Sequence, residues 1–158
     1  MKRILITLIT LSLFTFASAN TSNAATNQRS IEYLSDGSYY ETTITTKDIQ
    51  YHSLGRTASS TRSGKKTTTY KSSSGAKLWS VTVTGNFSYV KGKSSKCTSS
   101  SVSATSYSGS WKISNRASSK AGNTATASAT GSKYSGSTLI GSHSLKVTLT
   151  CDVNGNLS

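Results

Sequence analysis

Few residues of this sequence are of the types that carry out catalysis. The chain has two histidines, His52 and His143, and five acidic residues. Neither histidine lies in a local motif that pairs it with a catalytic nucleophile or carboxylate, and the common zinc, nucleophile-turn, phosphate-loop and calcium-loop motifs are missing. Four of the five acids precede Ile49, which leaves little from which to build the paired carboxylates of a glycoside hydrolase. The sequence therefore predicts no catalytic residue, no metal site and no cofactor, and a protein that is not an enzyme.

Basic residues dominate the ionisable side chains. The chain has 18 Lys and Arg against 5 Asp and Glu, a formal net charge of +13, and beyond Ile49 its only acid is Asp152. The candidate basic patch consists of Lys65, Lys66, Lys71, Lys91, Lys93 and Lys96. A surface with this charge attracts polyanions. No recognised nucleic-acid-binding motif accompanies it, so we expect no specific nucleic-acid ligand.

The N-terminus has the pattern of a secretory signal peptide. Lys2 and Arg3 precede an apolar stretch over 4–16, and Ala17-Ser18-Ala19 supplies the small residues that signal peptidase selects. The apolar stretch has 13 residues, too few to span a membrane as a helix, and no second apolar stretch follows. We predict a signal peptide over 1–19, with an alternative cleavage site after Ala25, and a secreted protein without a transmembrane segment. Loss of this leader leaves a net charge of +11.

Cys97 and Cys151 are the only cysteines. In an exported protein such a pair favours one disulfide, which would close a loop of about 55 residues and stabilise the fold by on the order of 4 kcal/mol. Two separate buried thiols are the alternative, and the Cys-x-x-Cys spacing of redox and zinc sites is absent. Cys97 is out of phase with Val102 and Ala104, so a bulge near 99–101 is needed to turn it toward the core.

Alternation of apolar and polar residues is the main structural pattern beyond Lys65. In 77–90 one parity holds Trp79, Val81, Val83, Phe87 and Tyr89. Near the C-terminus one parity holds Leu145, Val147, Leu149, Cys151 and Val153. Between them lie a mixed face and an alanine face: Tyr107, Trp111, Ile113 and Ala117, then Ala121, Ala125, Ala127 and Ala129. A period of two predicts half-buried strands, and the small alanines leave room for the facing aromatic rings.

Turn residues divide this pattern into about seven strands. We predict them near 38–49, 65–73, 77–90, 94–106, 110–118, 123–134 and 138–153, with a loop over 50–64. Because short turns join antiparallel neighbours, the predicted fold is all-β, with about seven antiparallel strands in a two-layer sandwich. A partly open barrel is the alternative. The sandwich domain is expected over 38–158, with its clearest pattern over 65–158, after a flexible N-terminal segment over 20–37.

Four segments of the mature chain form a recognisable set. They are 77–85, Cys97-Thr98, Trp111-Lys112-Ile113 and the ending over 149–158. The set resembles that of a family of small secreted proteins of unknown function from Gram-positive, clostridia-like bacteria. The resemblance covers roughly 62–158 and the leader, and the ending is its most specific part. It implies an exported bacterial protein and carries no activity with it.

Leader, charge and strand pattern lead to one functional expectation. We expect an exported, non-enzymatic β-domain that acts at the cell envelope, where its basic surface contacts anionic cell-wall polymers or other polyanions. The protein would then be secreted and associated with the cell wall. The alternative is a diffusible secreted effector, toxin-like or antimicrobial.

Overall fold

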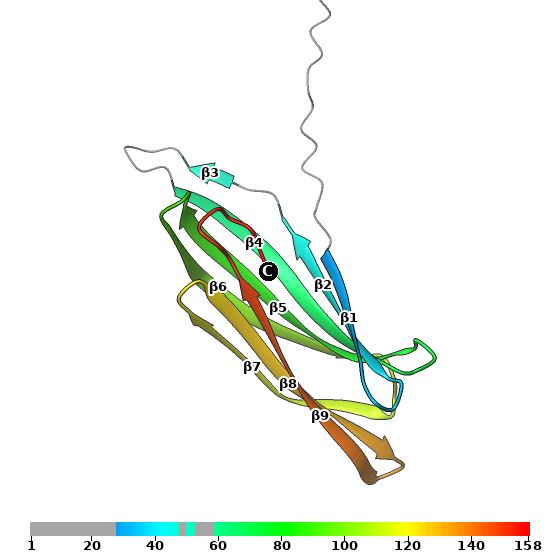
Figure 1. The fold of residues 1–158 in the computed structure, drawn as a ribbon. Coiled ribbons are helices and arrows are strands. Elements are labelled where there is room, and N and C mark those ends of the chain that lie inside the picture. Colours follow the sequence, from blue (N-terminus) through cyan, green and yellow to red (C-terminus); the bar gives the residue numbers. More distant parts are fainter. Residues whose placement is uncertain (1–27, 48–49, 53–58) are drawn as a thin grey trace, which may run out of the picture.

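The computed structural model describes residues 28–47, 50–52 and 59–158, and their regular structure consists of β-strands (Figure 1). The strands are β1 (Gln28–Tyr33), β2 (Tyr39–Thr46), β3 (Gln50–His52), β4 (Ser59–Lys71), β5 (Lys77–Val90), β6 (Ser94–Ser106), β7 (Trp111–Ala121), β8 (Thr124–Ser135) and β9 (Thr138–Thr150). Among the described residues there is no helix, and so none long and apolar enough to cross a membrane. The predicted signal peptide, 1–19, lies outside this part of the chain.

The strands form two antiparallel sheets that pack as two layers. One sheet has the order β1-β2-β4-β5-β6, with β3 also paired to β4, and the other has the order β7-β8-β9. The connection from β6 to β7 takes the chain from the first sheet to the second (Figure 1). This arrangement confirms the predicted all-β, antiparallel sandwich, and β5 and β6 have the bounds expected from the sequence.

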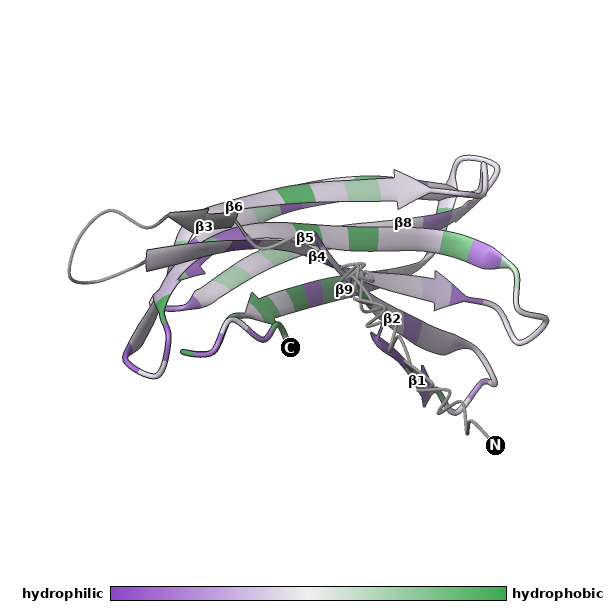
Figure 2. Ribbon diagram, turned by 90° about the horizontal axis from the view of Figure 1, so that it is seen from above, coloured by the Kyte–Doolittle hydropathy of each residue, from purple (hydrophilic) through white to green (hydrophobic). Residues whose placement is uncertain are grey.

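The core lies between the sheets and follows the predicted alternation, which Figure 2 shows as apolar bands along the strands. On β5, Trp79, Val81 and Val83 are fully buried. The residues of β8 that face the core are small and also buried: Ala125, Ala127 and Ala129. Gly131 continues their row, and a Cβ at this position would lie 2.4 Å from Cε2 of Trp79. Small residues on β8 therefore make room for the aromatic rings of β5.

A bulge in β6 turns Cys97 toward the core. The register between β5 and β6 shifts at Asn86 and Phe87, which pair with Ser99 and Cys97, so that Thr98 is the extra residue. Cys97 is consequently 2% exposed. The bulge required by the sequence pattern is present, one position before the 99–101 stretch where we expected it.

A second bulge reverses the faces of β7. The register between β7 and β8 shifts between Ser114 and Ala117, and Asn115 has a left-handed backbone with a φ of 50°. A bulge adds one residue, so the positions beyond it change face. Ala117 is therefore exposed, and the prediction that it shares the inward face of Trp111 is wrong.

Several strands differ from the sequence prediction: β2 ends at Thr46 instead of 49, β3 lies in the predicted loop over 50–64, and β7 continues to Ala121 instead of 118. The largest differences concern β1, β4 and β9. β1 lies within 20–37, where we expected a flexible segment, and it pairs with β2 although all its residues are exposed. A strand with no buried face has no alternation to reveal it. β4 begins at Ser59, inside the predicted loop over 50–64. β9 ends at Thr150, and Val153 lies 36% exposed in a turn instead of on the inward face.

One long side of the sandwich is closed by hydrogen bonds between the sheets, and the other side is open. Where β6 and β7 lie side by side, β7 side chains donate hydrogen bonds to β6 carbonyls: Arg116 to Ala104, Ser118 to Ser100 and Lys120 to Thr98. These bonds protect the edge of β6. On the other side, β1 and β2 extend the larger sheet beyond β9, and their inner face has no strand of the smaller sheet over it (Figure 1).

Candidate functional site

An open groove runs between β9 and the inner face of β2 and β4. Two hollows of about 270 and 290 Å³ lie along it, and both are lined by Thr42 and Lys66. The first is completed by Gln28, Arg29, Ser30, Ile44 and Ser158, and the second by Glu32, Tyr40, Thr68 and residues 145–148. We call this feature the β9 groove. It exists because a sheet of three strands cannot cover a sheet of six.

Lys66 is the cation at the centre of the β9 groove. It lies on the inner face of β4, where its ladder neighbours are Ile44 on β2 and Val83 on β5. Among the described residues its ammonium group has no carboxylate within salt-bridge distance. Burial lowers the pKa of Lys66. A partly buried cation without a counterion favours an anionic group that enters from solvent.

Hydroxyl groups form the floor of the groove beside Lys66. The hydroxyls of Thr42 and Thr68 lie 2.9 Å apart across the β2–β4 ladder. Tyr40 is half-buried, and its ring centroid lies 5.4 Å from that of Tyr70. Burial, followed by the nearby Tyr70, raises the pKa of Tyr40, so its phenol stays protonated and can donate a hydrogen bond. The floor therefore offers both donors and acceptors to a ligand.

The free edge of β9 forms the rim of the groove. β9 is the last strand of its sheet. At its C-terminal end Ser158 pairs with Thr150, and the amide of each donates to the carbonyl of the other at 3.0 and 2.9 Å. Leu157 forms the next bridge, with Cys151. Within the described residues no strand pairs with this edge between Ser144 and Thr148, so its backbone donors and acceptors face the groove.

An aromatic cluster lies next to Tyr40, at the end of the groove where β2 begins. The Tyr70 ring lies 5.0 Å from His143 and 5.5 Å from Trp111, and its hydroxyl donates to Oγ of Ser38 at 3.1 Å. Ser38 in turn donates to Asp36, and these hydrogen bonds lower the pKa of Asp36. The interactions hold the turn before β2 against the core. His143 thus packs within an aromatic group, whereas the side chain of His52 lies outside the described residues.

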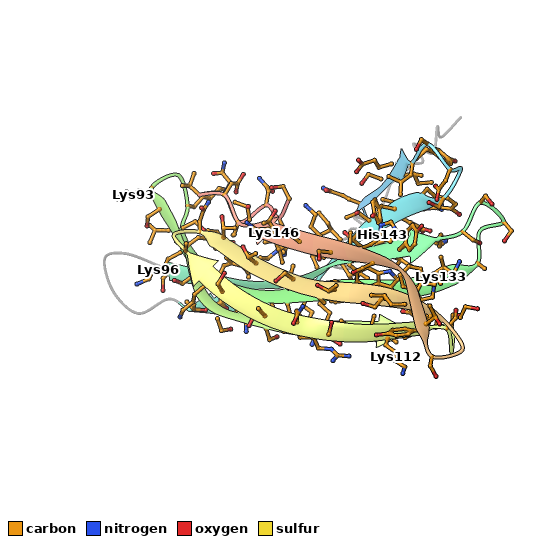
Figure 3. All side chains as sticks on the ribbon, turned by 90° about the horizontal axis from the view of Figure 1, so that it is seen from below. Lys93, Lys96, Lys112, Lys133, His143 and Lys146 are labelled. Carbon is orange, nitrogen blue, oxygen red and sulfur yellow. The ribbon has the colours of Figure 1, made fainter. Side chains whose placement is uncertain are left out.

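The six lysines of the predicted patch lie on different parts of the surface. Lys65 and Lys66 are neighbours on β4, so they point to opposite faces of the sheet. Lys71 forms an ion pair with Glu41, which also pairs with Arg29 at 2.8 Å. The remaining three lie in and after the β5–β6 turn: Lys91, Lys93 and Lys96. Figure 3 shows Lys93 and Lys96 at one end of the molecule, with Lys112 and Lys133 at the other.

The two cysteines are buried free thiols, so the predicted disulfide is not present. They nevertheless lie close to one turn, because the Cys97 amide donates to the carbonyl of Gly122 and the Cys151 amide to that of Asn123. Burial raises the pKa of both thiols. The alternative of two buried thiols, left open by the sequence, describes this structure.

The described residues contain no group of three potential metal ligands. A comparison of the chain with protein-family models, with curated proteins and with solved structures gives no match.

The β9 groove itself was not predicted. Its signal is a shared parity on two strands, Tyr40, Thr42 and Ile44 on one and Lys66, Thr68 and Tyr70 on the other. This parity becomes informative once the two strands are known to pair.

Proposed function

We propose that this protein is an exported, non-enzymatic β-sandwich that acts at the cell envelope through contact of its basic surface with anionic polymers. Export and the bacterial envelope are supported by the predicted leader and by the family resemblance of the C-terminal segments. Binding through charge is supported by the imbalance between free cations and engaged acids, which is the observation that carries the proposal.

The acids of the described residues are mostly occupied within the protein. Glu41 bridges two cations, and Asp36 accepts hydrogen bonds from Ser38. Asp152 accepts hydrogen bonds from the amides of Asn154 and Asn156. By contrast, Arg29 and Lys71 are the cations that form salt bridges within this part of the chain. Most lysines and arginines therefore face solvent without a fixed counterion, at both ends of the sandwich, and this arrangement favours contact with a flexible polyanion over one deep site.

Salt extraction of intact producing cells tests the envelope contact. At about 1 M salt the screening length falls to roughly 3 Å, so an electrostatically held protein should be released into the wash. Detection with an antibody against the mature domain measures this release. A protein that is already free in low-salt medium contradicts envelope retention, and the diffusible effector then becomes the better interpretation.

Two sets of charge variants test whether the contact is spread over the surface. One set replaces Lys91, Lys93 and Lys96 with Gln at one end, and the matched set replaces Lys77, Lys112 and Lys133 at the other. Affinity for poly(glycerol phosphate) should fall by a similar factor in both sets, with a weaker salt dependence than in the unmodified protein. Loss in one set alone would indicate a single localised patch. Unchanged affinity in both sets would refute the charge-based contact.

A further inference from the structure

The free edge of β9 already accepts a strand in one place. Ser158 and Thr150 exchange two backbone hydrogen bonds, and the chain runs antiparallel to β9 as it enters the groove. Residues 144–148 of β9 continue the same edge without a described partner. They span about 17 Å at roughly 3.4 Å per residue, enough for five residues of an added strand. An exposed edge of this kind is a template for pairing with another chain.

From this geometry we infer that the β9 groove binds an extended peptide segment of a partner protein, which adds to β9 as an antiparallel strand and places one acidic side chain against Lys66. The inference goes beyond the polyanion contact, because it rests on backbone pairing at one edge and on one lysine. It does not require the lysines at the two ends of the sandwich.

The strand register gives the position of the acidic residue. Directly opposed residues of an antiparallel pair project to the same face, so the peptide residue opposite Val147 points inward, as Val147 does. Lys66 lines the hollow that contains Val147 and also the hollow that contains Ser158. An inward carboxylate at this position would therefore meet the unpaired ammonium group of Lys66.

The other groups that face the groove restrict the sequence of the peptide. The other inward position of the added strand, opposite Leu145, would lie near the Thr42–Thr68 hydroxyl pair, which suits a small or β-branched side chain. Glu32 and Lys146 line the same hollow with opposite charges, so beside Lys66 they give no net preference for a second acid. The fitting segment thus combines β-branched residues with one acid at the position that opposes Val147. This composition distinguishes it from a uniformly charged polymer.

A labelled synthetic peptide tests the inference with the whole mature protein. The probe alternates threonine and valine, has a single glutamate at the position that opposes Val147, and carries a fluorophore for anisotropy titration. We expect saturable binding with a Kd below about 1 mM. Lys66→Met should raise this Kd about tenfold, as expected for the loss of a charge-assisted hydrogen bond. The matched control is Lys65→Met, on the opposite face of β4, which should leave the Kd unchanged.

A second probe tests the backbone pairing without any change to the protein. Methylation of the peptide amides that face β9 removes their hydrogen-bond donors, and it should abolish binding while leaving the charge of the probe unchanged. Equal binding of the methylated peptide, or equal weakening by Lys65→Met and Lys66→Met, would overturn strand addition in favour of diffuse charge attraction. Absence of saturable binding by the unmethylated probe would also overturn it. None of these results alters the salt-release test of the envelope contact.

Discussion

The substitution Gly131→Ala tests the packing that holds the two sheets together. A Cβ at residue 131 would lie 2.4 Å from Cε2, 2.6 Å from Cδ2 and 2.7 Å from Nε1 of Trp79, whereas ordinary contacts begin near 3.4 Å. The indole or the β8 backbone must therefore move by about 1 Å. Trp79 is fully buried and stacks on Trp111 at a centroid distance of 6.2 Å, so the ring has little space into which to move.

Overpacking of this kind costs about 1–3 kcal/mol of unfolding free energy. For a domain of this size the melting temperature should fall by about 4–12 °C. The matched control is Gly141→Ala, on β9, where a Cβ meets no atom within 4 Å. Since alanine restricts the unfolded chain more than glycine does, this control should be neutral or stabilise by up to about 1 kcal/mol.

Urea unfolding followed by tryptophan fluorescence measures both variants, because Trp79 and Trp111 are the only tryptophans and both lie in the core. The effect of Gly131→Ala should nearly vanish in a Trp79→Leu background, where the indole is gone, and this coupling assigns the cost to the contact itself. If Gly131→Ala destabilises no more than Gly141→Ala does, the close approach of β8 to Trp79 is wrong.

Three further predictions concern charge and thiols. Glu41→Gln should cost about 0.5–1 kcal/mol at neutral pH. Lys71 and Arg29 lower the pKa of Glu41 in the folded protein. The stabilisation by the ionised carboxylate is therefore present above the pKa of Glu41 in the unfolded chain and is lost as pH falls through the lower pKa of the folded state. The urea midpoints of the variant and the unmodified protein should thus converge in acid. Lys66→Met should stabilise the fold at neutral pH, and the difference should shrink as pH approaches 10.5, since the pKa of Lys66 is lowered only in the folded state. Cys97 and Cys151 should react with a chromogenic thiol reagent only after unfolding; rapid reaction of the folded protein would contradict their burial.

The strands that bury one face were predictable from the sequence. β5 and β6 were located to the residue, and the alanine row of β8 was correctly placed opposite the aromatic side chains. In these segments burial alternates with a period of two, and apolar and polar residues alternate in the sequence with the same period. The sequence of β1 has no such alternation because both of its faces are exposed. Its pairing with β2 depends on backbone hydrogen bonds and on the Arg29–Glu41 ion pair.

The candidate site could not be predicted in the same way, because it depends on which strands neighbour one another in space. Lys65 and Lys66 are adjacent in the sequence and were assigned to one patch, but one faces solvent on the outer side and the other faces the β9 groove. Alternation alone does not say which of two consecutive lysines points inward. That choice follows from Tyr70, which pairs with Trp79 in the core and fixes the parity of β4.

Lys66 conflicts with its local surroundings, and this conflict is the strongest physical argument that the β9 groove has a function. Its nearest neighbours on the inner face include Ile44, Val83 and Tyr70, all buried, although Thr42, Thr68 and Arg62 share that face. A β-branched apolar residue at position 66 would pack against Ile44 and Val83 without the desolvation that lowers the pKa of the lysine. Stability alone therefore favours another residue there. Natural sequences break such local rules mainly at functional sites. Beside an unpaired strand edge, a cation is useful because it can bind an anionic group of an incoming ligand.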